Sequence, residues 1–143
     1  MATIPHRRDQ FLSRVADLFQ QVKEWAEPHG WTTRPYPKKM RDVDQKVYET
    51  SALFLSKGPT RLLLDPVTYD VPGAEGVVDL ALMPTYDDAA SLYFEDGAWV
   101  IHYAFPADSG KRRSAKEAAR LSLSETTINQ VLDAIVAHDI QPF

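Results

Sequence analysis

Ser91, His102 and Asp79 are the residue types of a hydrolase triad, and all three lie in the middle of the chain. In such a triad a histidine takes the proton of a serine, and a carboxylate orients the histidine. No Gly-x-Ser-x-Gly segment accompanies them, and any chain of this length contains such a set by chance. We therefore expect His102 to be a half-exposed strand histidine that has no catalytic role.

Three carboxylates on or beside adjacent expected strands offer a second kind of chemistry. Asp65, Asp79 and Glu95 carry hard oxygen ligands of the kind that hold Mg²⁺ in sheet-based nucleases, where a strand lysine helps to activate water. No Glu-x-Lys pairing accompanies them, and a turn follows Glu95 directly. A metal-dependent hydrolase or nuclease using these three acids, with His102 assisting, is one alternative function. The simpler interpretation is that they are turn residues and solvating charges.

The other signatures of catalysis and cofactor binding are missing. The chain has no cysteine, which excludes thiolate zinc sites, iron–sulfur clusters and redox pairs. Its four histidines form no i, i+4 pair, and the glycines of residues 71–76 form neither a dinucleotide fingerprint nor a Walker loop. We expect no metal and no cofactor, and the balance favours a protein that is not an enzyme.

A basic segment follows the middle of the chain. Its cations within residues 110–120 are Lys111, Arg112, Arg113, Lys116 and Arg120. These side chains suit phosphate contacts, so nucleic-acid binding through residues 111–120 is a further alternative. Interleaved aromatic residues, on which single-stranded bases would stack, are absent. We expect residues 107–121 to form a flexible, solvated loop with a helical turn over residues 115–120.

The elements that would position these residues centre on a hairpin over residues 91–105. Asp-Gly between alternating apolar residues is a strong signal for a two-residue turn. With Asp96 and Gly97 in the turn, Ser91 lies opposite His102. One face is then apolar: Leu92, Phe94, Trp99, Ile101, Tyr103 and Phe105. The other is mixed: Tyr93, Glu95, Ala98, Val100, His102 and Ala104.

Other patterns predict the remaining elements. Apolar residues at helical spacing indicate one helix that ends near residue 27 and a second that begins after the N-cap Ser124. Strands are expected over residues 47–57, 61–71 and 77–83, with a bulge or edge at Pro66 and the last strand in a central position. The two prolines of residues 32–38 allow only an edge strand there. Residues 84–90 read as an acidic connection.

Length and composition bound the fold. With 143 residues, 44% hydrophobic and 25% charged, the chain has the size and balance of one globular domain. We expect a single α+β domain over residues 1–143, with an antiparallel meander of about five strands and both terminal helices on one face. It has no apolar run long enough to span a membrane, and we expect a cytoplasmic protein that binds no membrane.

The charge distribution provides the leading functional hypothesis. Net charge is −4, and residues 60–105 contain eight acids against the single base Arg61. We interpret the chain as a non-enzymatic protein-binding module, similar in shape to small inhibitors, immunity proteins and chaperone-like accessory proteins. Its partner would be another protein with a basic surface, or a second copy bound to the open sheet face. The expected contact residues are Tyr93, Asp87, Asp88, Glu95, Asp96, Val100 and His102.

Overall fold

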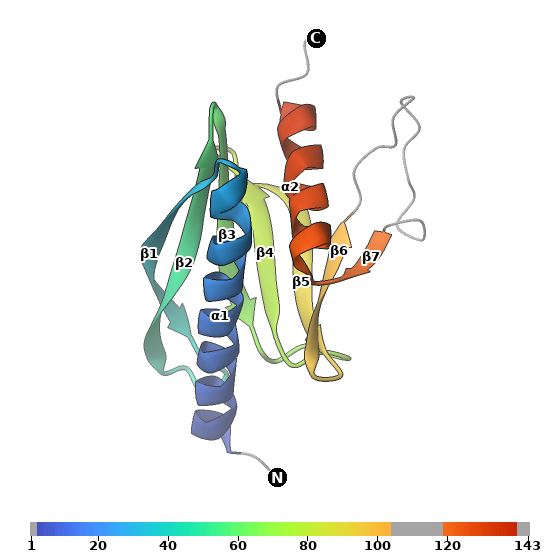
Figure 1. Ribbon diagram of the computed structural model, residues 1–143. Helices are drawn as coiled ribbons and strands as arrows, with labels where there is room; N and C mark the ends of the chain where they lie inside the picture. The colour runs from blue at the N-terminus through green and yellow to red at the C-terminus, as the bar shows by residue number, and fades with distance from the viewer. Residues whose placement is uncertain (1–2, 104–118, 140–143) are drawn as a thin grey trace.

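The computed structural model describes residues 3–103 and 119–139, which form two α-helices and one seven-stranded antiparallel sheet (Figure 1). The strands pair in chain order from β1 to β7. The elements are α1 (Ile4–Ala26), a 3₁₀ turn η1 (Glu27–His29), β1 (Thr32–Arg41), β2 (Val47–Lys57), β3 (Thr60–Thr68), β4 (Val77–Leu82), β5 (Asp87–Glu95), β6 (Ala98–Tyr103), β7 (Ala119–Ser122) and α2 (Glu125–Asp139). The predicted α+β domain with both helices on one face is confirmed.

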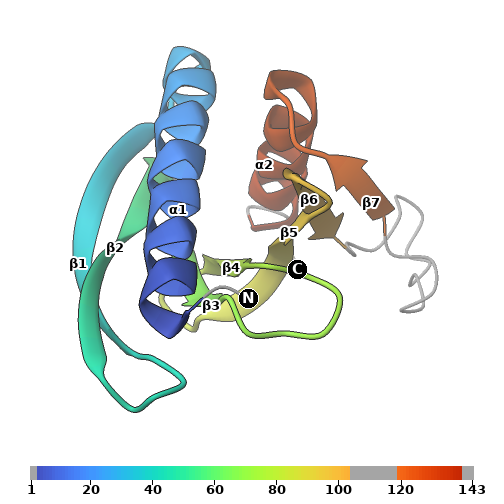
Figure 2. The same ribbon diagram turned by 90° about the horizontal axis from the view of Figure 1, so that it is seen from below.

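The sheet curves around the two helices, so it has a concave face that they cover and a convex face on the other side (Figure 2). The core lies between the helices and the concave face. Its largest fully buried side chains are Phe11, Leu18, Val22, Leu55, Leu62, Leu64, Leu80, Leu92, Ile101, Ile128, Leu132 and Ile135. Both predicted helix stripes contribute to it, which is the arrangement of a two-layer α+β domain.

The central hairpin has the predicted register. Glu95 pairs with Ala98, Phe94 with Trp99, and Ser91 with His102. Asp96 and Gly97 adopt φ values of 50° and 82°, as a type I′ turn requires at both central positions. Ile101 is fully buried on the concave face, and Trp99 is 7% exposed. Ala104 and Phe105 lie outside the described residues.

The predicted helix ends and the predicted irregularity at Pro66 are also confirmed. Ser124 caps α2, because its Oγ accepts a hydrogen bond from the Thr127 N–H at 3.1 Å. After α1, the chain turns through η1 and leaves at Gly30, whose φ is 94°. The register of β3 against β4 shifts just after Pro66, and β4 is the middle strand of the sheet.

Three predictions about the sheet are wrong. The sheet has seven strands instead of about five, because β1 pairs with β2 and β7 pairs with β6. β1 lies at the edge of the sheet, as its two prolines predicted. Only the first part of residues 84–90 is a connecting loop, since β5 begins at Asp87 and its first two residues pair with β4. Ala119 and Arg120 belong to the strand β7 and not to a helical turn. The rest of the expected loop, residues 107–118, lies outside the described part of the chain.

A buried polar network joins α1 to the β1–β2 turn and to the chain just after β3. The Asp42 side chain is completely buried and accepts hydrogen bonds from the Tyr69 hydroxyl, the Val43 N–H at 2.7 Å and Arg8 Nη1 at 3.0 Å. Burial alone would raise the pKa of Asp42, but these donors outweigh it, so that the pKa lies below its usual value. The network therefore holds a carboxylate inside the fold.

Gly76, in the loop before β4, lies close to the Phe11 ring of helix α1. A Cβ at this position would lie 3.1 Å from Cδ1 of the fully buried Phe11 ring. We expect Gly76→Ala to lower the free energy of unfolding by about 1–3 kcal/mol, since a packed ring has little room to shift. Denaturant unfolding measures this loss. In a Phe11→Leu background the same substitution should cost less, and equal costs in both backgrounds would contradict a clash with the ring.

Candidate functional site

The convex face carries a row of polar side chains across five neighbouring strands. Asp65 pairs with Asp79, Asp79 with Ser91, Ser91 with His102, and His102 with Arg120. Directly opposed residues in a sheet have Cβ atoms about 4.5–5.5 Å apart, so each of these side chains has the next one as its neighbour. The row brings together most of the residues that the sequence marks as candidates for chemistry.

The order of residues in this row does not build a serine–histidine–aspartate triad. Ser91 lies between the other two residues, and its hydroxyl donates to Asp79 Oδ1 at 3.1 Å. His102 Nε2 instead lies 3.4 Å from Glu95 Oε1, and its ring stacks against Tyr93 with centroids 4.6 Å apart. A triad needs the histidine between the serine and the acid. The geometry thus fits a strand histidine, 37% exposed, beside a carboxylate.

Asp65 and Asp79 are cross-strand neighbours, but Glu95 lies on the His102 side of the row, beyond Ser91. Within residues 3–103 and 119–139, no three histidine or acidic side chains are grouped closely enough to hold a metal ion. The predicted trio therefore does not converge on one cation.

A lysine does lie beside Asp65, although spacing along the chain gave no sign of it. Lys38 Nζ, from the edge strand β1, is 2.5 Å from Asp65 Oδ1, and the Tyr86 hydroxyl donates to the other carboxylate oxygen. Lys38 also donates to the Pro66 carbonyl. The ammonium group therefore neutralises Asp65 and fixes it in place.

Glu95 is paired in the same way. Arg120 of β7 donates to Glu95 Oε2, and His102 lies beside Oε1. We call Tyr93, Glu95, His102 and Arg120 the His102 cluster. Because Lys38 and Arg120 pair with two of the acids, the convex face is less acidic than the sequence between residues 60 and 105 indicates.

The other predicted contact residues are spread along β5 and its hairpin with β6. Val100 pairs with Tyr93 on the convex face, and Asp96 occupies the hairpin turn. Asp87 begins β5 and accepts a hydrogen bond from the Thr85 hydroxyl at 2.6 Å, while Asp88 pairs with Ala81 in the register. These residues therefore extend over the whole length of β5.

Only one of the basic residues proposed for nucleic-acid binding falls in the described part of the chain. Arg120 lies in β7 and pairs with Glu95. Lys111, Arg112, Arg113 and Lys116 lie outside the described residues.

An aromatic patch at the other end of the convex face was not predicted from the sequence. Tyr36 is 50% exposed and makes an edge-on contact with Phe54, with ring centroids 5.3 Å apart. The Arg34 guanidinium lies 5.8 Å from the Phe54 centroid, and Leu63 pairs with Phe54 from β3. We call these four residues the Tyr36 patch. The prolines around Tyr36 obscured its alternation with Arg34.

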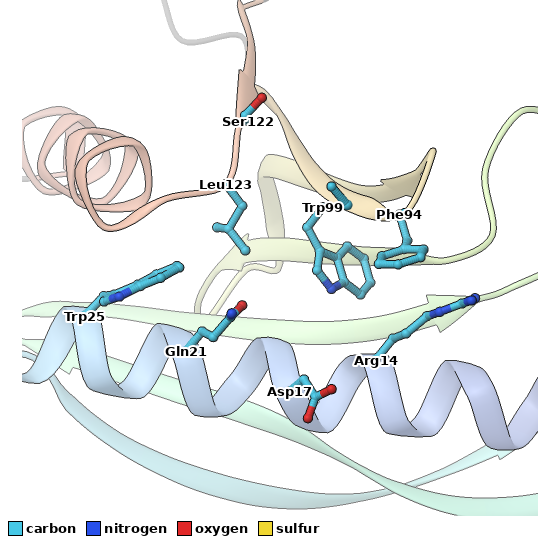
Figure 3. Close-up of a pocket in the computed structure, with 10 residues that line it drawn as sticks. Arg14, Asp17, Gln21, Trp25, Phe94, Trp99, Ser122 and Leu123 are labelled. Carbon is cyan, nitrogen blue, oxygen red and sulfur yellow. The ribbon is translucent and has the colours of Figure 1, made fainter.

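A cleft between α1 and the β5–β6 hairpin was not predicted either. It has a volume of about 380 Å³ and opens on the helix side of the sheet (Figure 3). Its lining residues are Arg14, Asp17, Gln21, Trp25, Phe94, Gly97, Ala98, Trp99, Ser122 and Leu123. The four from α1 recur at spacings of three or four residues, a second helical stripe beside the buried one. That spacing is the signal in the sequence that could have indicated the cleft.

No protein-family model, curated protein or solved structure matches this chain. Neither helix in the described residues has both the length and the apolar character needed to cross a membrane. The function must therefore be argued from the convex face and from the cleft.

Proposed function

We propose that this chain is a non-enzymatic protein-binding module, which binds a partner protein on the convex face of its sheet. The observation that carries the proposal is that both helices pack on the concave face (Figure 2), while the convex face presents the half-exposed Tyr36 and the paired charges of Asp65 and Glu95. Tyrosine and arginine side chains on a partly apolar surface are the residues that dominate protein interfaces.

The chemistry of the face favours a protein over other partners. Tyr36 and Phe54 offer aromatic contacts at one end, over the buried Leu63. Tyr93 and Val100 offer similar contacts at the other end, next to the carboxylates of Glu95 and Asp79. A partner that places apolar side chains at both ends and basic groups near the acids would match this pattern.

Substitution of Tyr36 tests the proposal with little risk to folding, because its ring is half exposed. We expect Tyr36→Ala to weaken the partner's affinity about tenfold, since truncating a central aromatic contact residue costs more than about 1 kcal/mol. The control is Val47→Ala, which trims an even more exposed side chain at the far end of β2, outside the patch. The measurement is the affinity for a protein captured with this chain as bait.

Charge reversal tests the acidic residues at the two ends of β5 and in the hairpin turn. Asp87→Lys, Asp88→Lys, Glu95→Lys and Asp96→Lys together should weaken capture of a basic partner, and the remaining affinity should depend less on salt. Capture that is indifferent both to these reversals and to Tyr36→Ala would overturn the proposal. A self-associating chain would be recognised by sedimentation, as a dimer that Tyr36→Ala dissociates.

The two alternative functions make different predictions for the same protein. Metal-dependent hydrolysis through Asp65, Asp79 and Glu95 requires turnover that depends on added Mg²⁺ and is lost in Asp79→Asn. Nucleic-acid binding through residues 111–120 requires an affinity that falls steeply with salt. It would also disappear when Lys111, Arg112, Arg113, Lys116 and Arg120 become alanine.

A further inference from the structure

We infer that the cleft between α1 and the β5–β6 hairpin is a binding site for a small organic cation, an alkylammonium or quaternary ammonium group on a short apolar body. The site is separate from the convex face, because it opens on the side of the sheet that carries the helices (Figure 3). The inference is independent of the proposed protein-binding function.

The size and walls of the cleft suit a small ligand. Its volume of about 380 Å³ falls at the lower end of the range found for small-molecule sites. Trp25 of α1, Trp99 of β6 and Phe94 of β5 supply three aromatic walls, and Leu123 lies between the two tryptophans (Figure 3). Aromatic faces attract cations through the negative potential above the ring, most strongly when several rings surround one ammonium group.

One end of the cleft already shows this contact. The Arg14 guanidinium lies 4.3 Å from the centroid of the Phe94 ring, which in turn meets Trp99 edge to face at 5.3 Å. Arg14 is also paired with Glu75, at 3.3 Å between Nη1 and Oε2. The pairing with Glu75 offsets part of the charge of the guanidinium and holds it against Phe94.

The lining of the cleft also carries one carboxylate. Asp17 lies on α1 between Arg14 and Gln21, lines the cleft, and makes no hydrogen bond or ion pair with another described residue. Asp96 adjoins the lining residue Gly97 at the tip of the hairpin. An unpaired carboxylate in the lining of a cleft that also contains aromatic rings favours a cationic ligand over a neutral or anionic one.

Three probes of equal shape and different charge test the inference. They are choline, its neutral isostere 3,3-dimethyl-1-butanol, and the anion 3,3-dimethylbutanoate, each titrated into the whole chain and followed by amide chemical shifts. We expect choline to bind about tenfold more tightly than the neutral isostere. The shifts should map to Gly97, Ala98 and the cleft side of α1. Equal affinity for choline and the alcohol, or tighter binding of the anion, would overturn the inference.

Substitutions locate the site. Asp17→Asn should weaken choline binding roughly threefold, as expected for an exposed charge contact. Asp9→Asn changes another exposed aspartate of α1 that does not line the cleft, and it should have no effect. Trp25→Leu should also weaken binding, by roughly fivefold, because one aromatic wall is lost. Choline binding that survives both Asp17→Asn and Trp25→Leu would place the ligand elsewhere and refute the assignment.

Two further measurements distinguish a free ligand in the cleft from a ligand on the convex face and from a protein side chain. Tyr36→Ala should leave choline binding unchanged, so that failure of the convex-face proposal and failure of the cleft proposal are distinguishable. A lysine side chain from a partner protein carries the same ammonium chemistry. If a capped trimethyllysine amide binds the same residues more tightly than choline, the cleft receives a protein side chain, and the free-ligand assignment is wrong.

Discussion

Asp42→Ala should destabilise the protein by about 3–5 kcal/mol, the usual cost of removing one partner of a buried ion pair. Asp42 is the acceptor for the Tyr69 hydroxyl, the Val43 N–H and the Arg8 guanidinium, and its side chain has no exposure to water. Without the carboxylate, the hydroxyl of Tyr69, a residue only 3% exposed, has no acceptor. The measurement is the free energy of unfolding in denaturant.

Asp44→Ala is the matched control for this prediction. Asp44 lies in the same β1–β2 turn and accepts a hydrogen bond from the Lys46 N–H at 3.1 Å, but this contact is exposed to solvent. We expect its removal to cost about 0.5–1 kcal/mol. Similar losses for the two variants would show that the turn, and not the buried carboxylate, stabilises this end of the fold.

The same network gives stability a defined pH dependence. The folded pKa of Asp42 is lowered, so its contribution is complete above the unfolded pKa of about 3.9 and is lost as the pH falls below it. Burial, followed by the hydrogen bond to Asp42, raises the pKa of Tyr69. Its contribution is therefore complete below about pH 10 and is lost as the pH rises above that value. Asp42→Asn should flatten the acid side of the profile, and Tyr69→Phe the alkaline side.

Much of the fold could be predicted because the relevant signals are local. Asp96-Gly97 specifies a two-residue turn, and this turn fixes every residue pairing between β5 and β6. Ser124 and the spacing of Ile128, Leu132 and Ile135 similarly define α2 from within a few turns of chain. Interactions between residues that are close along the chain determine where these elements begin and how they pair.

The polar pairs of the site could not be predicted in this way. Lys38 reaches Asp65 from the edge strand β1, across β2, and Arg120 reaches Glu95 only because β7 adds to β6. Arg8 likewise reaches Asp42 only because α1 packs against the sheet. The helical and strand periodicities of the sequence relate only residues that are close along the chain, so they do not reveal these pairs. Counting charges along the chain therefore overstated the acidity of the convex face.

The strand β7 was missed for a different reason. Its four residues, Ala119 to Ser122, alternate too briefly to form a pattern, and only Leu121 is a large apolar side chain. The strand forms because β6 offers a free edge, where Ile101 pairs with Leu121 and His102 with Arg120. Tertiary pairing determines the element, and local propensity does not.

Two neighbouring residues of β6 should respond in very different ways to truncation. Ile101 is completely buried on the concave face, whereas Val100 lies on the convex face and is 9% exposed. Ile101→Ala should cost about 2–5 kcal/mol, because it leaves a cavity between the sheet and the helices. Val100→Ala should cost roughly 1 kcal/mol, because no second layer closes over the space it leaves.

Chemical denaturation of the two variants measures the difference, and the ratio of the losses reports which face of the hairpin is covered. Pairing between Ser91 and His102 places Val100 on the same face as Tyr93 and Ile101 opposite Leu92. A shift of one residue in this register would exchange the two faces and reverse the order of the losses. Equal losses would mean that a layer covers the convex face in the isolated chain, in which case the proposed docking surface does not exist.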